Sequence, residues 1–364
     1  MPTLPPFGRF FLPGPTEVRP EILQAQVGPM MAHRAKGMEE LIARVQPTLQ
    51  SLFRTQRPVY IAASSATGFM EAAVRNAARR VLCLVNGAFS ERFHKIARMC
   101  GLDADALEVQ WGEANTPDQL ADALARKRYD AVTIVHCETS TGVLNPVAEL
   151  TRVAHEAGDV MVLVDAVTSI GGTTFETDAW GVDFVLTGSQ KCLALPPGLA
   201  LAVAQERLLR RAEAREDRGL YFDLVAFEKN IRKNQPPNTP AVSLLYALEA
   251  QMRRIEEETV EGRWARHDAM AERVWRWVEA MRDRGVGISI LAPEGYRSPT
   301  VTCLRVPEGW TGPRLSAALA ERGFTVASGY GKMKDELIRI GHMGDHTPDE
   351  VDAFLEALEE VLVR

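Results

Sequence analysis

Residues 161–204 decide the fold of this chain. They contain MVLVDAVTSIGG (161–172), FVLTGSQKCLALPPG (184–198) and ALAVA (200–204). Each segment holds a short run of almost purely apolar residues, and the first two runs stop at a polar or glycine-containing turn. Apolar runs of this length are typical of strands buried in a sheet that helices cover on both faces.

The same kind of run recurs on the N-terminal side. It appears as VYIAA (59–63), VLCLVN (81–86), AVTIVH (131–136) and, more weakly, LEVQ (107–110). Helical stretches separate these runs at 69–79, 89–99, 117–126 and 146–157. This alternation predicts an α/β fold, with a large domain built on a mostly parallel seven-stranded sheet. In such sheets, ligands bind beyond the carboxyl ends of the strands.

The sequence changes character near residue 255, and we place the domain boundary near 258. One long amphipathic helix is predicted from residue 255 to Gly285, followed by short elements of both kinds. Strands are expected at 287–291, 300–306, 324–327 and 336–342, and helices at 312–322 and after Thr347. Thr347, Pro348 and Glu350 have the pattern of a capped helix start. We therefore predict an N-terminal arm (1–16), a large domain (17–258) and a smaller α+β domain (259–364).

Composition excludes several classes of protein. The 364 residues are 46% hydrophobic and 25% charged, and 42 basic against 48 acidic side chains leave a formal charge of −6. This balance disfavours nucleic-acid binding. No apolar run is long enough to span a membrane, and the start MPTLPPFGRFFLPGP lacks an export signal, so we expect a cytoplasmic protein.

The cysteines and histidines do not form a metal motif. Five cysteines occur without a CxxC pair, and seven histidines without HExxH, so we expect reduced thiols and no metal. There is also no G-x-G-x-x-G, no phosphate-binding P-loop and no G-x-S-x-G. Nucleotide binding and serine-hydrolase chemistry are therefore disfavoured.

Four segments at predicted strand ends could carry chemistry. They are SSATG (64–68), HCETSTG (136–142), Asp165 and Lys191. Taken singly, each has a plain structural explanation: a helix cap, a solvated loop, a turn-capping carboxylate and a surface lysine. His136 alone is expected to be a buried histidine with its hydrogen bonds satisfied. Together, a phosphate-binding turn, an aspartate and a lysine on one face are what pyridoxal phosphate requires.

At these residues the chain resembles the class V aminotransferases of pyridoxal phosphate fold type I, specifically the serine–pyruvate and alanine–glyoxylate group. The resemblance runs from LPGPTEV (12–18) to RIGHMGD (339–345). It rests on the set HxExSTG, VDAVTSIGG, GSQKxLxxPPG, NTPAV and RIGHMG, each of which is weak alone. It implies the fold type I architecture, with the large and small domains predicted above.

The resemblance implies a role for each matching residue. Lys191 would form the internal aldimine with pyridoxal 5'-phosphate, and Asp165 would pair with the pyridine nitrogen. Ser65, Ala66 and Thr67 match the phosphate loop, with Ala66 standing where many relatives have glycine.

Further cofactor contacts are implied by position. Phe89 matches the aromatic residue that stacks on the ring, where several relatives have tryptophan. Thr139 matches a contact near the ring hydroxyl, Val167 a ring-packing position and Gln190 a contact on the phosphate side.

Two matches extend beyond the cofactor contacts of one subunit. Thr239 matches a phosphate ligand supplied by the partner subunit, which implies a homodimer with shared active sites. Pro236 stands where some relatives have a tyrosine, so that phosphate contact is lost. Arg339 matches the arginine that binds the substrate carboxylate.

The implied activity is transamination. An amino group would pass from a small L-amino acid, serine or alanine, to glyoxylate or pyruvate by ping-pong kinetics, with Lys191 moving the proton. The main alternatives are an aminoethylphosphonate–pyruvate or an aspartate transaminase. A phosphonate enzyme typically has NKC where this chain has SQKC.

Other hypotheses about the function have less support in the sequence. Phosphoserine transaminases have another strand-end motif. A cysteine desulfurase needs a cysteine on a mobile loop, whereas Cys303 lies in an apolar run. A non-catalytic protein would have lost Lys191. A nicotinamide dehydrogenase lacks support without the glycine motif, and a hydrogenase subunit without a cysteine ligand set.

Overall fold

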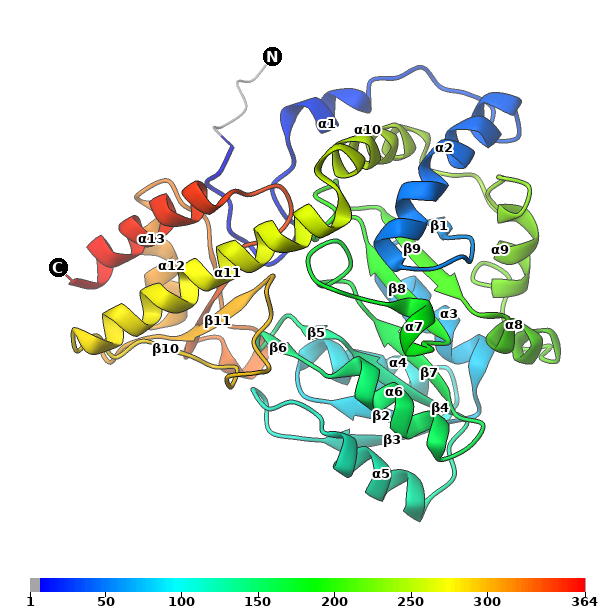
Figure 1. The fold of residues 1–364 in the computed structure, drawn as a ribbon, viewed down its shortest axis with the longest axis horizontal. Helices are drawn as coiled ribbons and strands as arrows, with labels where there is room; N and C mark the ends of the chain where they lie inside the picture. Colours follow the sequence, from blue (N-terminus) through cyan, green and yellow to red (C-terminus); the bar gives the residue numbers. More distant parts are fainter. Residues whose placement is uncertain (1–6, 364) are drawn as a thin grey trace.

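The computed structural model describes residues 7–363 and contains a large central sheet with a smaller sheet beside it (Figure 1). The strands of the large sheet are ordered β1-β9-β8-β7-β4-β2-β3. Their bounds are β1 Tyr60–Ala63, β2 Arg80–Val85, β3 Asp103–Glu108, β4 Ala131–Val135, β7 Met161–Asp165, β8 Phe184–Gly188 and β9 Leu199–Ala204. Only β9 runs against its neighbours, so the predicted mostly parallel seven-stranded sheet is confirmed.

The edge strand β3 begins earlier than the sequence suggested. The predicted run at 107–110 covers only its last residues, because pairing with β2 already starts at Arg80 and Asp103. Asp103 and Asp105 interrupt the apolar pattern of the strand, and both lie near Lys127 at the surface. Charged side chains are typical of exposed sheet edges, where they discourage pairing with other chains.

The helices between the strands lie close to their predicted positions. They are α3 Ala66–Ala77, α4 Ala88–Met99, α5 Pro117–Arg126 and α6 Val147–Glu156. Six more helices had not been singled out: α1 Pro20–Ala25, α2 Lys36–Phe53, α7 Thr177–Trp180, α8 Glu206–Glu213, α9 Leu224–Ile231 and α10 Val242–Glu258. Helix α3 starts three residues before residue 69, because Ser65 is the extended N-cap and the turn after it is already helical.

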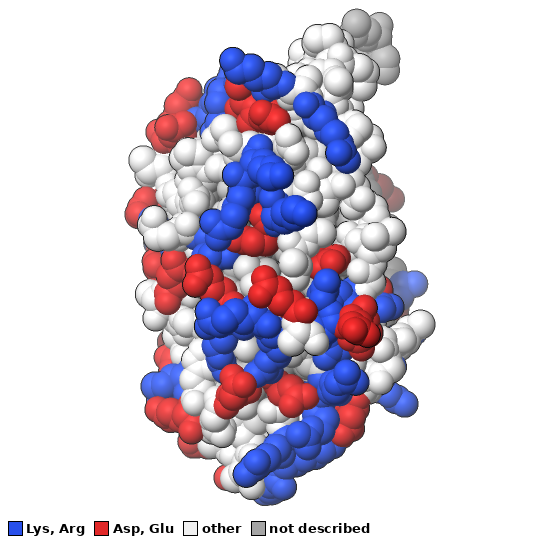
Figure 2. All heavy atoms as spheres, turned by 90° about the vertical axis from the view of Figure 1, so that its right-hand side faces the viewer, with Lys and Arg blue, Asp and Glu red and all other residues white. Residues whose placement is uncertain are grey.

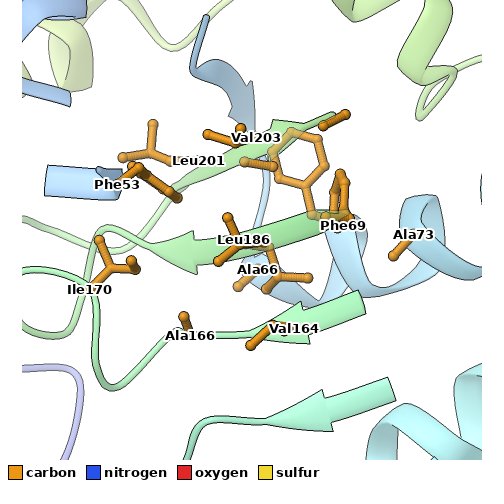
Figure 3. Packing of buried hydrophobic residues seen from close by; sticks show 14 of the residues in the cluster. Phe53, Ala66, Phe69, Ala73, Val164, Ala166, Ile170, Leu186, Leu201 and Val203 are labelled. Atoms are coloured by element: carbon orange, nitrogen blue, oxygen red, sulfur yellow. The ribbon is translucent and has the colours of Figure 1, made fainter. Parts of the chain in front are cut away.

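Helix α3 is fixed against the large sheet by its apolar face (Figure 3). Phe69 and Ala73 of this helix are fully buried, beside Leu186 of β8 and Val203 of β9. Burying a phenylalanine side chain contributes about 2–3 kcal/mol. This packing holds the N-terminus of α3 rigidly at the carboxyl end of β8.

The smaller sheet is antiparallel, with strand order β10-β11-β13-β12. Its strands are β10 Ser289–Ile290, β11 Thr302–Arg305, β12 Ala327–Ser328 and β13 Leu337–Ile340, and its helices are α11 Val260–Asp283, α12 Gly312–Ala320 and α13 Pro348–Val363. Strand β12 starts later than the predicted 324–327. A separate hairpin joins β5 Cys137–Glu138 to β6 Val143–Leu144.

The predicted continuous helix from residue 255 to 285 is wrong. Helix α10 ends at Glu258 and α11 begins at Val260, with Thr259 between them at φ 68°. The Thr259 hydroxyl accepts a hydrogen bond from the Gly262 N–H at 3.1 Å and so caps α11. The break falls where the sequence predicts the domain boundary; the division into domains itself stays a prediction.

The predicted cap of the last helix is confirmed. The Thr347 N–H donates to the Glu350 carboxylate at 2.8 Å, and the Glu350 N–H donates to the Thr347 hydroxyl at 3.3 Å. These reciprocal bonds satisfy two backbone donors at the start of α13.

The N-terminal segment connects the two sheets; residues 1–6 of the predicted arm lie outside the described residues. Phe11 is buried in the core of the smaller sheet, where its N–H donates to the Thr325 carbonyl at 2.8 Å. Further along, the Thr16 N–H donates to the Gln190 carbonyl at 2.9 Å. The segment therefore runs from the small sheet to the residues beside Lys191.

Basic and acidic side chains are interspersed on the face that carries α8 and α9 (Figure 2). Arg207 and Arg211 of α8 both pair with Asp159, at 2.7 and 2.5 Å. Within residues 7–363, no helix combines the length and apolar character needed to cross a membrane.

Candidate active site

A cavity of about 290 Å³ opens at the carboxyl ends of β7 and β8. Asp165 is the last residue of β7, and Lys191 follows β8 by three residues. Nine of the predicted site residues line this cavity: Ser65, Ala66, Thr67, Phe89, Thr139, Asp165, Val167, Gln190 and Lys191. The strand order brings them together although they span more than a hundred positions, as expected for the ligand side of a parallel sheet.

Lys191 is a buried amine without an ion-pair partner among the described residues. Its Nζ donates a hydrogen bond to the Pro13 carbonyl and lies 5.7 Å from the centre of the Phe89 ring. Burial, helped by the positive charge of Arg339, lowers the pKa of Lys191 to about 8. A substantial fraction of the amine is therefore neutral slightly above pH 7, as a nucleophile or proton acceptor must be.

Asp165 is a buried carboxylate that also lacks a paired cation in the described part of the chain. Its Oδ1 accepts a hydrogen bond from the Val167 N–H at 2.8 Å. Burial raises the pKa of Asp165 to about 7. A buried carboxylate is costly unless it is paired, so this position suits a ligand that brings a positive charge or a proton donor.

The N-terminus of α3 faces the same cavity. Its N-cap, Ser65, makes no side-chain hydrogen bond to the helix, and no acidic residue lies in the first turn. A Cβ at Gly188 would lie 2.7 Å from Gln190 Oε1 and 3.4 Å from Ala66 Cβ, so this glycine lets Gln190 approach the helix start. Free N–H groups at a helix N-terminus bind phosphate.

Glu138, which was not among the predicted site residues, holds Phe89 in place. Its buried carboxylate accepts hydrogen bonds from the N–H groups of Phe89 and Ser90 at the start of α4 and from the Ser140 hydroxyl at 2.6 Å. Gly87 is required beside it, because a Cβ there would lie 2.4 Å from Glu138 Cγ. The sequence signal that could have pointed to Glu138 is its place as the one acidic residue in the polar segment 136–142.

Two threonines of the cavity lining, Thr139 and Thr168, are held by hydrogen bonds. Thr139 and Thr168 join their hydroxyls at 2.5 Å, and the Thr300 hydroxyl donates to the Thr168 carbonyl at 2.7 Å. Thr168 lines the cavity and was also not predicted. Thr300 precedes β11 of the small sheet, so these bonds connect that sheet to the cavity wall.

Arg339 reaches the region from β13 of the small sheet. Its Nε donates to the Ser328 carbonyl at 2.9 Å, and its guanidinium lies 5.3 Å from the centre of the Tyr330 ring. In the described residues it has no carboxylate partner. Arg339 does not line the cavity, yet its charge acts on Lys191. It is a cation available to an anionic ligand.

Three predictions away from the cavity have different outcomes. Thr239 is exposed in the loop before α10, beside Tyr221 and Pro236, so its own chain does not bring it to the cavity. His136 is buried as expected, with its ring edge-on to Phe175 at 5.2 Å, but its Nδ1 has no hydrogen-bond partner in the described residues. Cys303 is buried within strand β11 and does not lie on a loop.

The family model for class V aminotransferases matches residues 23–354. The chain belongs to the class V aminotransferase family. It is therefore a transaminase that depends on pyridoxal phosphate, as the resemblance implied. The buried carboxylate, the buried amine and the open helix N-terminus fit this cofactor.

Relatives of this class V aminotransferase match nearly its whole length. An uncharacterized aminotransferase of Methanocaldococcus jannaschii is 37% identical, over 96% of this chain and 91% of the relative. The L-aspartate–glyoxylate aminotransferase of Paracoccus denitrificans is 32% identical, over 93% and 86%. The serine–glyoxylate aminotransferase of Methylorubrum extorquens is 31% identical, over 92% and 86%.

Solved structures agree with the family assignment. The alanine–glyoxylate aminotransferase of Nostoc sp. has a TM-score of 0.92 and 30% identity, covering 100% of this chain and 97% of that one. An aspartate aminotransferase from Thermus thermophilus has a TM-score of 0.89 and 31% identity, covering 98% and 99%. The class V aminotransferase thus has the fold type I architecture predicted from its sequence.

Because the pKa of Asp165 is raised, the free energy of unfolding should depend on pH. The folded protein favours the neutral acid of Asp165. The loss of folding stability caused by this group therefore grows as the pH rises from about 4 toward 7, and it reaches its full size above pH 7. In the cofactor-free protein, Asp165→Asn should increase the free energy of unfolding at pH 8, by up to ~4 kcal/mol. The increase should vanish near pH 4. Urea unfolding over this pH range measures it.

The control for this prediction is Asp159→Asn. Hydrogen bonding to Arg207, with Arg211 nearby, lowers the pKa of Asp159, so its stabilisation is present at neutral pH and lost on acidification. Its replacement should therefore change stability with the opposite sign. A constant effect of Asp165→Asn at every pH would contradict the buried, proton-binding carboxylate.

Proposed function

We propose that this transaminase moves the amino group of a small L-amino acid, serine or alanine, to glyoxylate or pyruvate. The observation that carries the proposal is the meeting of Lys191 and Asp165 in one cavity, with Arg339 acting on Lys191 from the small sheet. Arg339, which has no carboxylate partner among the described residues, suits the α-carboxylate of a substrate, and a cavity of about 290 Å³ must hold both cofactor and substrate. This combination favours short substrates.

The chain's own residues would divide the work. Pyridoxal phosphate, when bound, supplies the aldehyde that accepts the amino group and a ring that withdraws electrons. Ser65, Ala66, Thr67 and Gln190 would hold its phosphate at the α3 N-terminus, and Phe89, Thr139 and Val167 its ring. Asp165 would keep the ring nitrogen protonated, which its buried position favours because that nitrogen provides the missing positive partner.

Lys191 and Arg339 would act on the substrate. Lys191 would remove the proton from the substrate α-carbon and return it to the cofactor, because its pKa of about 8 lets the amine exchange protons near neutral pH. Arg339 would hold the α-carboxylate through two parallel hydrogen bonds. Glu138 would act through Phe89 as a positioning residue.

The choice of amino donor has support on two sides. Relatives named for serine and alanine match this chain at 31% and 30% identity. Relatives named for aspartate match as well, and Arg92 places a second guanidinium in the cavity lining. Aspartate is therefore the second candidate donor.

We further propose a homodimer in which Thr239 contacts the phosphate bound by the partner subunit. Thr239 is exposed and lies beside Tyr221, and large apolar side chains are exposed at Val27, Met30 and Leu220. An interface that covers these side chains would remove their apolar surface from water. A cytoplasmic location is part of the proposal, because the five cysteines are free thiols, as in reducing compartments; cell fractionation tests it.

Lys191→Ala should abolish transamination, because the variant has no amine to hold the cofactor or to move the proton. We expect turnover of L-serine or L-alanine with glyoxylate to fall by on the order of 10³-fold or more. The visible absorbance of the purified protein should also lose the band of covalently held cofactor. Lys95→Ala, at an exposed lysine of α4, is the control. Retained steady-state transamination would refute the assignment.

Arg339→Ala should raise KM for L-alanine by about 10- to 100-fold, since a charge-assisted pair to the α-carboxylate is lost. Arg339→Lys should give an intermediate KM, because lysine lacks the planar fork. Steady-state kinetics measure both. Arg305→Ala on the neighbouring strand, where the side chain is exposed and pairs with Glu336, should leave KM unchanged. An unaltered KM in Arg339→Ala would mean that another group binds the carboxylate.

Thr239→Ala should weaken cofactor binding several-fold without dissociating the dimer, since one hydrogen bond to phosphate is lost. Sedimentation gives the oligomeric state, and titration of the cofactor-free protein gives the affinity. A monomer that binds the cofactor with full affinity would contradict both the dimer and the role of Thr239.

A further inference from the structure

Tyr330 lies between the two guanidinium groups of the site. It comes from the loop between β12 and β13, and its ring lies 5.5 Å from the Phe89 ring, centre to centre. The guanidinium of Arg339 is 5.3 Å from the centre of the Tyr330 ring. At the end of the same side chain, Arg92 Nη2 donates to the Tyr330 hydroxyl at 3.3 Å. One side chain thus contacts both cations and the stacking residue.

Arg92 is a cation that the proposed reaction does not use. It follows Phe89 by one turn of α4, lines the cavity with Lys191, and places its guanidinium 4.9 Å from the centre of the Phe89 ring. Among the described residues, the guanidinium has no carboxylate partner, and its hydrogen bond goes to the neutral hydroxyl of Tyr330. Its positive charge is therefore not neutralised within the chain.

The loop backbone holds Tyr330 in this place. The Gly329 N–H donates to the Leu337 carbonyl at 2.6 Å, and the Met333 N–H donates to the Tyr330 carbonyl at 3.1 Å. A Cβ at Gly329 would lie 1.9 Å from the Met333 carbonyl oxygen, so the turn is too tight for another residue there. The tyrosine is therefore presented by a closed turn that the short 3-10 helix η1 (Gly331–Met333) continues.

We propose that Tyr330 determines substrate specificity by restricting the site to amino and keto acids with a single carboxylate. A dicarboxylic substrate with its α-carboxylate on Arg339 would need Arg92 for the second carboxylate. Tyr330 contacts both arginines, with its ring beside the Arg339 guanidinium and its hydroxyl hydrogen-bonded to Arg92. The inference rests on the proposed function, because it assigns the α-carboxylate to Arg339.

The hydrogen bond between Tyr330 and Arg92 should affect which substrates bind. A hydrogen bond from a guanidinium to a carboxylate is stronger than one to a neutral hydroxyl. Removing the side chain should therefore expose a cation that favours a second carboxylate. Tyr330→Phe keeps the ring and loses only the hydroxyl, whereas Tyr330→Ala removes both, so the two variants separate the hydrogen bond from the filled space.

The test compares kcat/KM for L-aspartate and L-alanine, with glyoxylate as acceptor, in the holoenzyme. We expect the native protein to prefer L-alanine and Tyr330→Ala to raise the aspartate-to-alanine ratio by about tenfold or more. Tyr330→Phe should raise it less. The gain should disappear in the double variant Tyr330→Ala/Arg92→Gln. A native preference for aspartate, an unmoved ratio, or a gain that persists without Arg92 would each overturn the proposal.

A binding measurement separates this inference from the proposed function. Succinate and propionate lack an amino or keto group, so calorimetry reports their binding without turnover. Tyr330→Ala should bind succinate more tightly relative to propionate, and Arg92→Gln should cancel the change. That result without any transamination would refute the proposed function and support the role of Tyr330. Alanine transamination with unchanged succinate binding in Tyr330→Ala would uphold the function and overturn the role.

Discussion

The site depends on the burial of two oppositely chargeable groups that are not paired with each other. Asp165 and Lys191 stand at the carboxyl ends of adjacent strands, in a sheet whose neighbouring side chains are apolar. Burial raises the pKa of Asp165 and lowers that of Lys191, so both groups are shifted toward the uncharged form. A direct ion pair would have removed this reactivity. The fold keeps each group available to a ligand that brings the opposite partner.

Contacts from distant parts of the chain hold the lysine segment in position. The Thr16 hydroxyl donates to the Lys191 carbonyl at 3.1 Å, and Arg263 Nη2 donates to the Cys192 carbonyl at 2.7 Å. Arg263 is fully buried and pairs with Asp345 at 2.9 Å, so α11 and the segment before α13 are joined behind the lysine. Breaking such a buried ion pair would leave a buried charge without a partner, at a high cost in free energy, so this contact stabilises the position of the lysine segment.

The small sheet and its loops also contribute residues near the cavity. Arg339 and Tyr330 come from the small sheet and meet Phe89 and Arg92 of α4. Glu138 fixes the start of α4, so one buried carboxylate helps to position both the Phe89 ring and Arg92. The cavity lining thus comes mainly from the large sheet and its helices, while the small sheet places Arg339 near Lys191.

The sequence by itself determined the strand pattern, because apolar runs are local, and its resemblance to the class V aminotransferases implied the cofactor and nine residues of the cavity. It missed the break at Thr259 and the early start of β3, since a capping hydroxyl and a charged edge strand disguise the periodicity. Only the tertiary structure placed Tyr330 between Arg92 and Arg339 and left Thr239 outside its own cavity. Those contacts join residues far apart in the chain, where no local pattern carries the information.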